Sequence, residues 1–165
     1  MKTRRDMYEV LEDTGPGLWW AQMGPSDFDE LKAKLRASRP DAWVTMLRGW
    51  KCQEPVGFFS ELGAALQLPY YFEETWESTA QMLSDTTWWP APFHVLMVNN
   101  AEHLLADSSF AEVRSLVEVL TSACAGARMK VVFAFWAPDG GDGLDRLRAA
   151  GANLVPLDAA EGLVA

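Results

Sequence analysis

The fold is constrained most by two short, nearly continuous apolar runs, Phe-His-Val-Leu-Met-Val at residues 93–98 and Val-Val-Phe-Ala-Phe-Trp at residues 131–136. Runs that are apolar at almost every position, rather than at alternate ones, are typical of central strands covered on both faces. Both runs therefore predict buried strands, and a sheet that contains them needs helices to cover it. The length of 165 residues suits one domain with a sizeable core.

Helical patterns separate the predicted strands. Pro55 lies at a first-turn position and opens a helix, which Pro69 closes. Ser109 and Glu112 form a capping box for a helix that Gly126 stops. The other predicted elements are a helix at 7–13, a strand at 18–23, a helix at 26–37 capped by Ser26, a strand at 42–47, a helical turn at 101–106, a short helix from Asp142 to Ala150 and an edge strand at 153–157. Strands that alternate with helices predict an α/β fold with a mainly parallel β-sheet flanked by helices.

The clearest candidate for a working surface is the stretch from Leu68 to Ser84, where a proline-stopped helix end leads through an aromatic turn into an acidic amphipathic helix. The face predicted to pack inward holds Phe72, Trp76, Thr79, Ala80 and Leu83. A contiguous polar face holds Glu73, Glu77, Gln81 and Ser84, with Tyr71 at its start. Acidic residues in a first turn stabilise a helix through its dipole, but the dipole would also favour lysine in the second half, where none occurs. We therefore interpret the polar face as a binding surface.

The net charge of −9 comes from one central segment. No Lys or Arg lies between Cys52 and Val113, whereas nine of the 23 acidic residues do, and the rest of the chain has 14 acidic and 14 basic residues. This asymmetry argues against direct binding of nucleic acid and favours a basic protein partner attracted at long range. An acidic surface that only keeps the protein in solution is the alternative explanation.

No local pattern predicts a catalytic or metal site. The Gly-rich loop at residues 139–143 matches neither G-x-G-x-x-G nor G-x-x-x-x-G-K and is predicted to be a plain surface loop. His94 and His103 lack metal-ligand spacing and are predicted to be structural, and Cys52 and Cys124 are isolated. A catalytic group assembled in three dimensions stays open, but we expect no enzyme, no cofactor and no metal. Because no apolar run approaches the length of a membrane span, we expect a cytoplasmic protein.

A series of motifs surrounds the candidate surface. The series comprises F-x-E-L-x-x-A-L-x-L-P from Phe59 to Pro69, Tyr71, E-x-W-E at 74–77, a W-W-P linker at 88–90, a V-L-M-V strand at 95–98, a final helix and a V-V-F-A-F strand at 131–135. In order and spacing these motifs resemble the barstar family, the intracellular bacterial ribonuclease inhibitors, over roughly residues 44–136. The flanks resemble the extensions of longer, actinobacterial-type members.

The resemblance implies a three-stranded parallel sheet flanked by helices. The length of the chain predicts a single domain over residues 1–165, and the resemblance divides it into a barstar-like core at about 42–136, an N-terminal extension at 1–41 and a C-terminal extension at 137–165. In that family the second helix and the loop before it plug the active site of a basic, secreted ribonuclease, so the implied partner is a protein.

Residue by residue, the resemblance also predicts where this partner binds. Tyr71 matches the interface tyrosine of the family, and Glu77 matches an interface aspartate that is one methylene shorter. Gln81 stands where the family places its central acid, the side chain that mimics an RNA phosphate, so Glu73 or Glu77 would have to supply that charge. The other departures are Glu73 for glycine, Thr75 for asparagine, Ala80 for tryptophan, and Thr121 and Ala125 for two acids of the last helix. The predicted partner-binding residues are Tyr71, Glu73, Glu74, Thr75, Trp76, Glu77, Ala80, Gln81 and Ser84.

These observations lead to two functional hypotheses. The first is a monomeric cytoplasmic inhibitor or immunity protein, of the kind found in toxin–antitoxin pairs, that blocks a basic ribonuclease or related toxin through the acidic helix at 71–85 and the loop before it. The second is a barstar-like module or regulator that binds a partner other than a ribonuclease, with the aromatic-rich flanks as the interface. Neither hypothesis needs a membrane or direct contact with nucleic acid.

Overall fold

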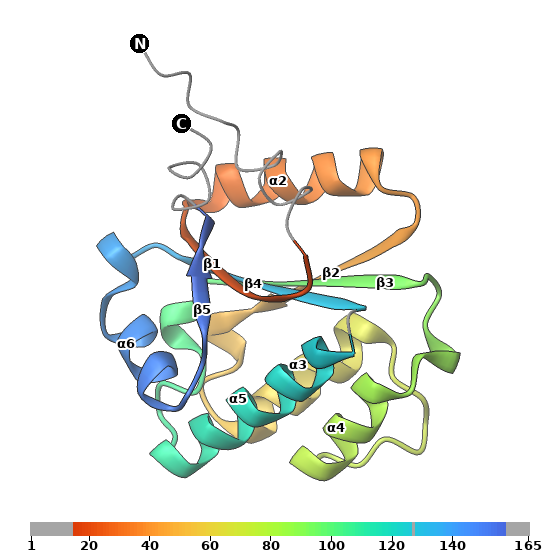
Figure 1. The fold of residues 1–165 in the computed structure, drawn as a ribbon. Helices are drawn as coiled ribbons and strands as arrows, with labels where there is room; N and C mark the ends of the chain where they lie inside the picture. The colour runs from red at the N-terminus through yellow and green to blue at the C-terminus, as the bar shows by residue number, and fades with distance from the viewer. Residues whose placement is uncertain (1–14, 127, 158–165) are drawn as a thin grey trace.

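A computed structural model describes residues 15–126 and 128–157, in which a parallel β-sheet lies between two layers of helices (Figure 1). In these residues the sheet has five strands in the order β2-β3-β4-β1-β5. The strands are β1 (Gly17–Gln22), β2 (Ala42–Arg48), β3 (Phe93–Asn99), β4 (Met129–Phe135) and β5 (Leu154–Pro156). The helices are α2 (Pro25–Ser38), α3 (Pro55–Leu66), α4 (Trp76–Ser84), α5 (Phe110–Ala125) and α6 (Gly141–Ala149), with short 3-10 turns η1 (Gly49–Lys51), η2 (Thr86–Trp88), η3 (Ala101–His103) and η4 (Pro138–Gly140). The strand pairings are parallel, which confirms the predicted α/β fold.

The two apolar runs form buried strands, as predicted, and the structure places these strands next to each other in the sheet. β3 pairs with β2 on one side and with β4 on the other, and β4 pairs with β3 and β1. All seven residues of β4 are buried, and in β3 only Phe93 is partly exposed. A strand that is covered on both faces and paired at both edges has no solvent side, which explains why these runs do not alternate with polar residues.

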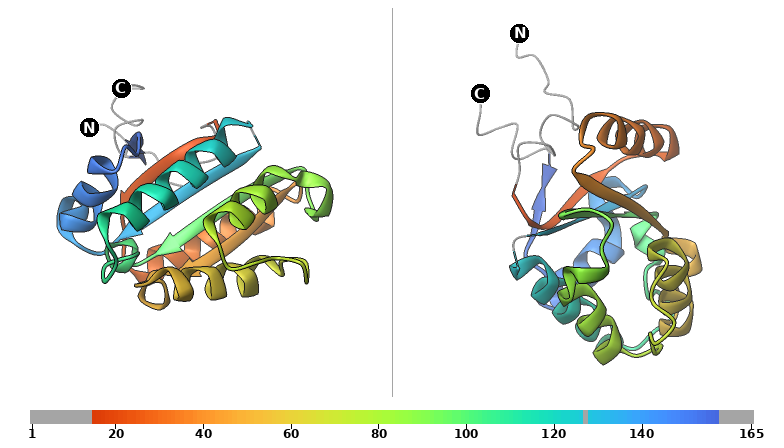
Figure 2. Two further views of the ribbon diagram at one scale, coloured as in Figure 1. Left: turned by 90° about the horizontal axis from the view of Figure 1, so that it is seen from below. Right: turned by 90° about the vertical axis from the view of Figure 1, so that its right-hand side faces the viewer.

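Helices cover the two faces of the sheet unequally (Figures 1 and 2). Among the described helices, α2 is the one that covers the first face, and it packs Phe28 and Leu31 into a cluster with Met97 of β3. The other face is covered by α3 and α5, whose Leu62 and Leu116 belong to a larger apolar cluster. Helix α4 lies on this same side of the sheet and packs against α5.

The terminal flanks contribute strands to the same sheet. Strand β1 pairs with β4 from Gly17–Lys130 to Gln22–Phe135, and the short β5 pairs with β1 at the edge. The three strands between residues 42 and 135 are therefore continued by two more, in place of the three-stranded sheet that the resemblance implies. The predicted strands at 18–23 and 153–157 are confirmed within one residue at each end.

Two predicted helix caps are wrong. Ser26 does not cap α2, because Gly24 is the N-cap and Pro25 occupies the first turn, where its fixed φ and missing N–H suit a helix start. Asp142 does not cap α6, which begins at Gly141 directly after Gly140 with φ 81°. The segment 139–143 is thus a helix entrance and not a plain surface loop. The helix predicted at 7–13 lies outside the described residues.

Candidate protein-binding surface

Helix α4 is shorter than predicted and begins after the first two acidic residues. Thr75 is its N-cap, with an extended backbone and a hydroxyl that accepts a hydrogen bond from the Ser78 N–H at 3.0 Å. The Ser78 hydroxyl in turn accepts one from the Glu73 N–H at 3.0 Å, which fixes the preceding loop on the helix. The predicted helix at 71–85 is therefore corrected to Trp76–Ser84, and Glu73 and Glu74 belong to the loop before it.

Trp76 anchors this helix to its neighbours. The ring centroid of Trp76 lies 5.4 Å from that of Phe58 and 4.8 Å from that of Phe59, both on α3. Its indole N–H donates a 2.6 Å hydrogen bond to the Glu112 carboxylate of α5. Thr79 and Leu83 are buried on the same side, and Trp76 and Ala80 are half-buried. These contacts hold α4 against α3 and α5, as the predicted inward face requires.

The remaining predicted residues lie on the outer side. Exposed side chains are those of Tyr71, Glu73, Glu74, Thr75, Glu77, Gln81 and Ser84. Tyr71 is 52% exposed and packs edge-to-face on Tyr70, which is 99% exposed, with ring centroids 5.6 Å apart. Two exposed aromatic rings beside an acidic helix are characteristic of protein-binding surfaces, where tyrosine is enriched.

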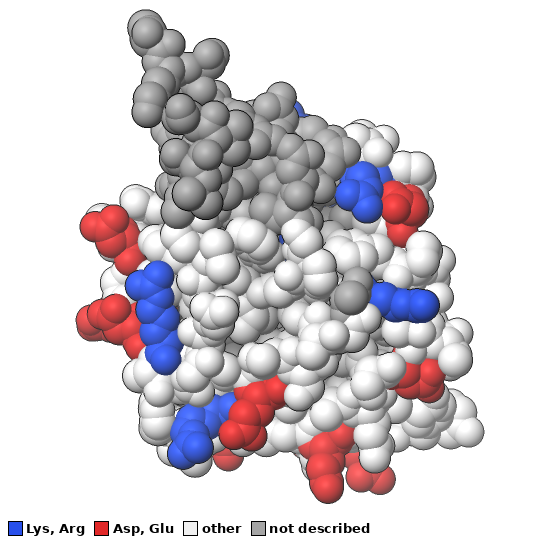
Figure 3. All heavy atoms as spheres, viewed as in Figure 1, with Lys and Arg blue, Asp and Glu red and all other residues white. Residues whose placement is uncertain are grey.

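The charges on this surface are uncompensated. Among the described residues, no ion pair involves Glu73, Glu74 or Glu77. Glu61, an acid of the same lysine-free segment, differs because Arg48 donates to both of its carboxylate oxygens at 2.7 and 3.0 Å, which lowers the pKa of Glu61. In Figure 3 the charged side chains over α4, at the lower right of the view, are acidic. The acids around α4 therefore remain available to a basic partner.

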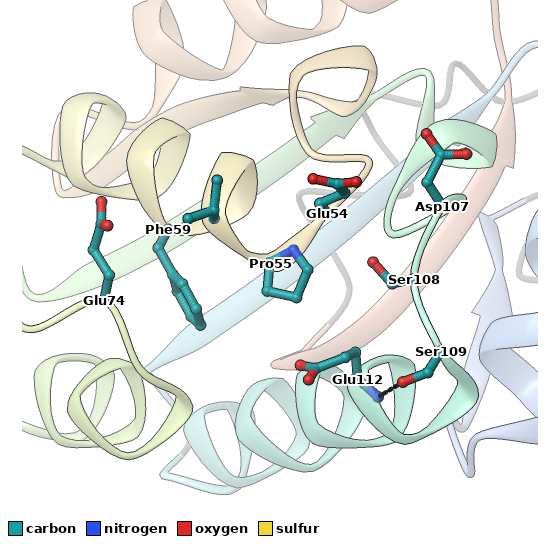
Figure 4. Close-up of a pocket in the computed structure, with 9 residues that line it drawn as sticks. Glu54, Pro55, Phe59, Glu74, Asp107, Ser108, Ser109 and Glu112 are labelled. Carbon is teal, nitrogen blue, oxygen red and sulfur yellow. Dashed lines mark hydrogen bonds between the residues drawn. The ribbon is translucent and has the colours of Figure 1, made fainter.

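A cavity beside Glu74 adds residues that the sequence did not point to. Three further carboxylates border it, those of Glu54, Asp107 and Glu112 (Figure 4). They come from the start of α3, the loop before α5 and the first turn of α5, so helical periodicity could not relate them to Glu74. The signal that could have found them is the lysine-free segment itself, which holds all four.

The buried histidine and the two buried cysteines are held in their neutral forms by burial. His94 is stacked on Trp43 at 4.4 Å and hydrogen-bonded to the Thr45 hydroxyl at 2.7 Å, and burial lowers its pKa to about 3. Burial raises the pKa of Cys52 to about 12 and that of Cys124 to about 11, so neither thiol ionises readily. Within the described ranges, no three His, Cys, Asp or Glu side chains are grouped so that they could hold a metal ion.

Comparisons with known proteins give one family and one shared fold. A family model described as Barstar (barnase inhibitor) matches residues 41–136, which is more than half of the chain. A comparison with curated protein sequences finds no match.

Solved structures with a similar fold include three archaeal proteins. Cdc6p from Pyrobaculum aerophilum has a TM-score of 0.59 and 12% identity, over 92% of this chain and 42% of that one. The ORC2 protein from Aeropyrum pernix has a TM-score of 0.61 and 7% identity, over 94% of this chain and 48% of that one. A Walker-type ATPase from Pyrococcus abyssi has a TM-score of 0.59 and 11% identity, over 95% of this chain and 53% of that one. The chain thus spans about half the length of these proteins. Such identities indicate a common fold alone, and the sequence contains no G-x-x-x-x-G-K-[ST] phosphate loop.

Proposed function

This chain belongs to the barstar family, and on that premise we propose that it is an inhibitor or immunity protein that binds and blocks a basic ribonuclease or a related toxin. Binding would use the outer side of α4 and the loop before it. The action is steric and electrostatic, so it requires neither a cofactor nor a chemical step. The description of the family as a barnase inhibitor supports this class of partner.

One observation carries the proposal: three exposed carboxylates stand unpaired near Tyr71, those of Glu73 and Glu74 in the loop before α4 and that of Glu77 in the first turn of α4. Unpaired acids of one sign attract a basic protein over a long range and raise its association rate. A helix held by Trp76 against α3 and α5 loses little freedom on binding, which favours affinity.

The neutral side chain at position 81 affects how the protein can bind a basic partner. Gln81 is exposed on α4 where the family pattern has an acid, so it can donate or accept a hydrogen bond but cannot neutralise a basic active site. Glu77 lies four residues earlier on the same helix, one turn away, and Glu73 lies in the loop. We infer that these two acids carry the electrostatic part of binding in place of residue 81.

The proposal is tested by mixing the protein with the basic ribonuclease encoded by a neighbouring reading frame, or with a microbial one, and measuring complex formation across salt concentrations. Affinity is expected to fall as salt rises, because the attraction between exposed charges is screened. Glu77→Lys should weaken binding strongly, whereas Asp142→Lys on α6, at the far end of the molecule from α4 (Figure 1), should change it little. Absence of a complex at low salt with every basic nuclease tried would sink the proposal.

The second candidate is a barstar-like module whose partner is not a ribonuclease. The neutral Gln81 favours it, as do the absent acids at Thr121 and Ala125. Hydrogen exchange in the complex separates the two candidates, with the partner recovered by pull-down where no ribonuclease binds. Protection at residues 71–85 supports inhibition through α4, and protection centred on residues 18–24 or the C-terminal segment supports the module.

We further propose that the protein acts in the cytoplasm as a monomer and contacts neither nucleic acid nor membrane. The acidic charge makes nucleic acid an unfavourable ligand. No helix in the described part of the chain is long and apolar enough to cross a membrane. Sedimentation of the purified protein alone and with the ribonuclease measures the stoichiometry, for which a one-to-one complex is expected.

A further inference from the structure

Strand β2 forms one edge of the sheet, where β3 is its single partner among the described strands. An edge strand presents a row of unpaired N–H and C=O groups that a strand of another chain can join. The opposite edge strand, β5, has three residues and ends in Pro156, which has no N–H to donate. Strand β2 has seven residues and is therefore the edge at which strand addition is to be expected.

Two side chains occupy the outer row of backbone groups on β2. Successive residues of a strand direct their N–H and C=O groups to opposite sides, so Val44, Met46 and Arg48 share one side. The Arg36 guanidinium donates a hydrogen bond to the Val44 carbonyl oxygen at 3.1 Å. The Glu61 carboxylate accepts one from the Arg48 N–H at 3.3 Å. Because side chains and not β3 bond these groups, this row is the outer one.

The two side chains approach the edge from opposite faces of the sheet. Arg36 comes from α2 and Glu61 from α3, which cover different faces (Figure 1). The Arg48 guanidinium also donates to both Glu61 oxygens at 2.7 and 3.0 Å and so fixes that carboxylate. Between them the Lys32 ammonium lies 4.0 Å from the Met46 sulfur. An added strand would have to displace Arg36 and Glu61 and remove a lysine charge from water, which is unfavourable.

We propose that Arg36 and Glu61 close the β2 edge against strand addition, and that without them β2 pairs with β2 of a second copy of this chain. A second copy is the expected occupant because antiparallel pairing of a strand with itself has two-fold symmetry, in which each contact is made twice. Among the described residues, the Met46 N–H and C=O have no backbone partner beyond the sheet ladder, so the middle of this edge is ready to pair. The inference is independent of the proposed function, since neither residue lies on α4.

The test is sedimentation velocity of the purified chain over a range of concentrations. Arg36→Met with Glu61→Met keeps most of the side-chain volume but removes both hydrogen bonds to the edge. This variant should form a reversible dimer, with a dissociation constant at least about tenfold lower than that of the wild type, because two freed backbone groups gain partners. The matched control is Arg114→Met with Glu118→Met, which makes the same chemical change at two exposed positions of α5 and should remain monomeric.

Hydrogen exchange shows whether a dimer forms through β2. In the edge variant the Met46 N–H should exchange more slowly as protein concentration rises, whereas in the wild type its exchange should not depend on concentration. Arg36→Met alone frees the Val44 carbonyl and leaves Glu61 in place, so it should self-associate to an intermediate degree. It provides the reading if the double variant does not fold.

Three results would overturn the inference. They are a natively folded edge variant that stays monomeric at every concentration, equal self-association of the α5 control, and a dimer that leaves exchange of the Met46 N–H unchanged. A wild-type protein that already pairs through β2 would overturn it as well. None of these results bears on inhibition through α4, which is measured separately by ribonuclease binding.

Discussion

Gln81 is the residue at which a single added charge should change the affinity for a basic partner most clearly. It is exposed on α4 and presents a neutral amide where the family pattern has an acid. Gln81→Glu adds one negative charge with almost the same shape. If the partner is a basic ribonuclease, affinity should rise by about tenfold, since close charge pairs at such interfaces contribute about 1.5 kcal/mol or more. Calorimetric titration measures the change.

The matched control for this substitution is Gln22→Glu, which adds the same charge at the exposed end of β1, away from α4. It should leave affinity within a factor of two or so, because exposed charges beyond about 10 Å are screened. Equal gains in both variants would mean that net charge, and not the α4 surface, governs binding.

The buried His94 should make the protein less stable as the pH falls. Burial lowers its pKa to about 3 in the folded protein, against 6.5 for an unperturbed histidine. Between these values the unfolded chain binds a proton that the folded chain does not, so stability falls as pH falls. From pH 6.5 to 5, above the range in which the Glu61 carboxyl protonates, the loss should approach 1.4 kcal/mol per pH unit at most.

Urea unfolding at several pH values measures this slope. In His94→Gln the slope over that interval should disappear, whatever the stability of the variant at neutral pH. His103→Gln is the control, because that side chain is exposed in η3 and should leave the slope in place. A wild-type slope that survives in His94→Gln would contradict the assignment.

Helix α4 depends at its first turn on one hydroxyl. Thr75→Ala removes the acceptor of the Ser78 N–H and should destabilise the protein by about 1 kcal/mol in urea unfolding, the usual effect of losing an N-cap. Thr75→Ser keeps the acceptor and should restore most of that stability. If alanine and serine behave alike, the hydroxyl does not set the start of the helix.

The start of α4 also shows where sequence reasoning met its limit. Glu73, Glu77, Gln81 and Ser84 have helical spacing, so the pattern extended the helix backwards through residues that are in fact loop. The cap at Thr75 had no acid three residues on and resembled no capping box, and the Ser78 hydroxyl that holds Glu73 belongs to tertiary geometry. The inward face was predictable because Trp76 and Leu83 are apolar wherever the helix begins.

At the scale of the whole molecule, local patterns indicated the strands but not their order. The continuous apolar runs of β3 and β4 predicted buried strands. No local sequence pattern, however, indicates that β1 lies between β4 and β5. Parallel pairing joins segments distant in sequence, and the choice depends on which faces α2 and α5 cover. The cavity beside Glu74 escaped prediction for the same reason, since Glu54 and Asp107 meet only in the folded chain.

The order of the strands predicts that the barstar-like core does not fold by itself. Removal of residues 1–41 deletes β1 and α2, which leaves β4 paired only with β3, β5 without its partner β1 and the Met97 face without α2. The fragment should lose near-ultraviolet circular dichroism and bind hydrophobic dyes, with no cooperative unfolding transition. A fragment that unfolds cooperatively from a native-like state would show that the N-terminal extension is a separate unit. We propose the single domain over residues 1–165 on this ground.

Inhibition of a basic ribonuclease through α4, as proposed, can be measured directly. The most direct measurement is RNA cleavage by that enzyme as the protein is added, in parallel with Glu77→Lys. Wild-type protein should abolish cleavage at about one molecule per enzyme, and Glu77→Lys should require a large excess because it reverses a charge on the binding surface. Cleavage that continues unchanged in the presence of excess wild-type protein at low salt would contradict the account.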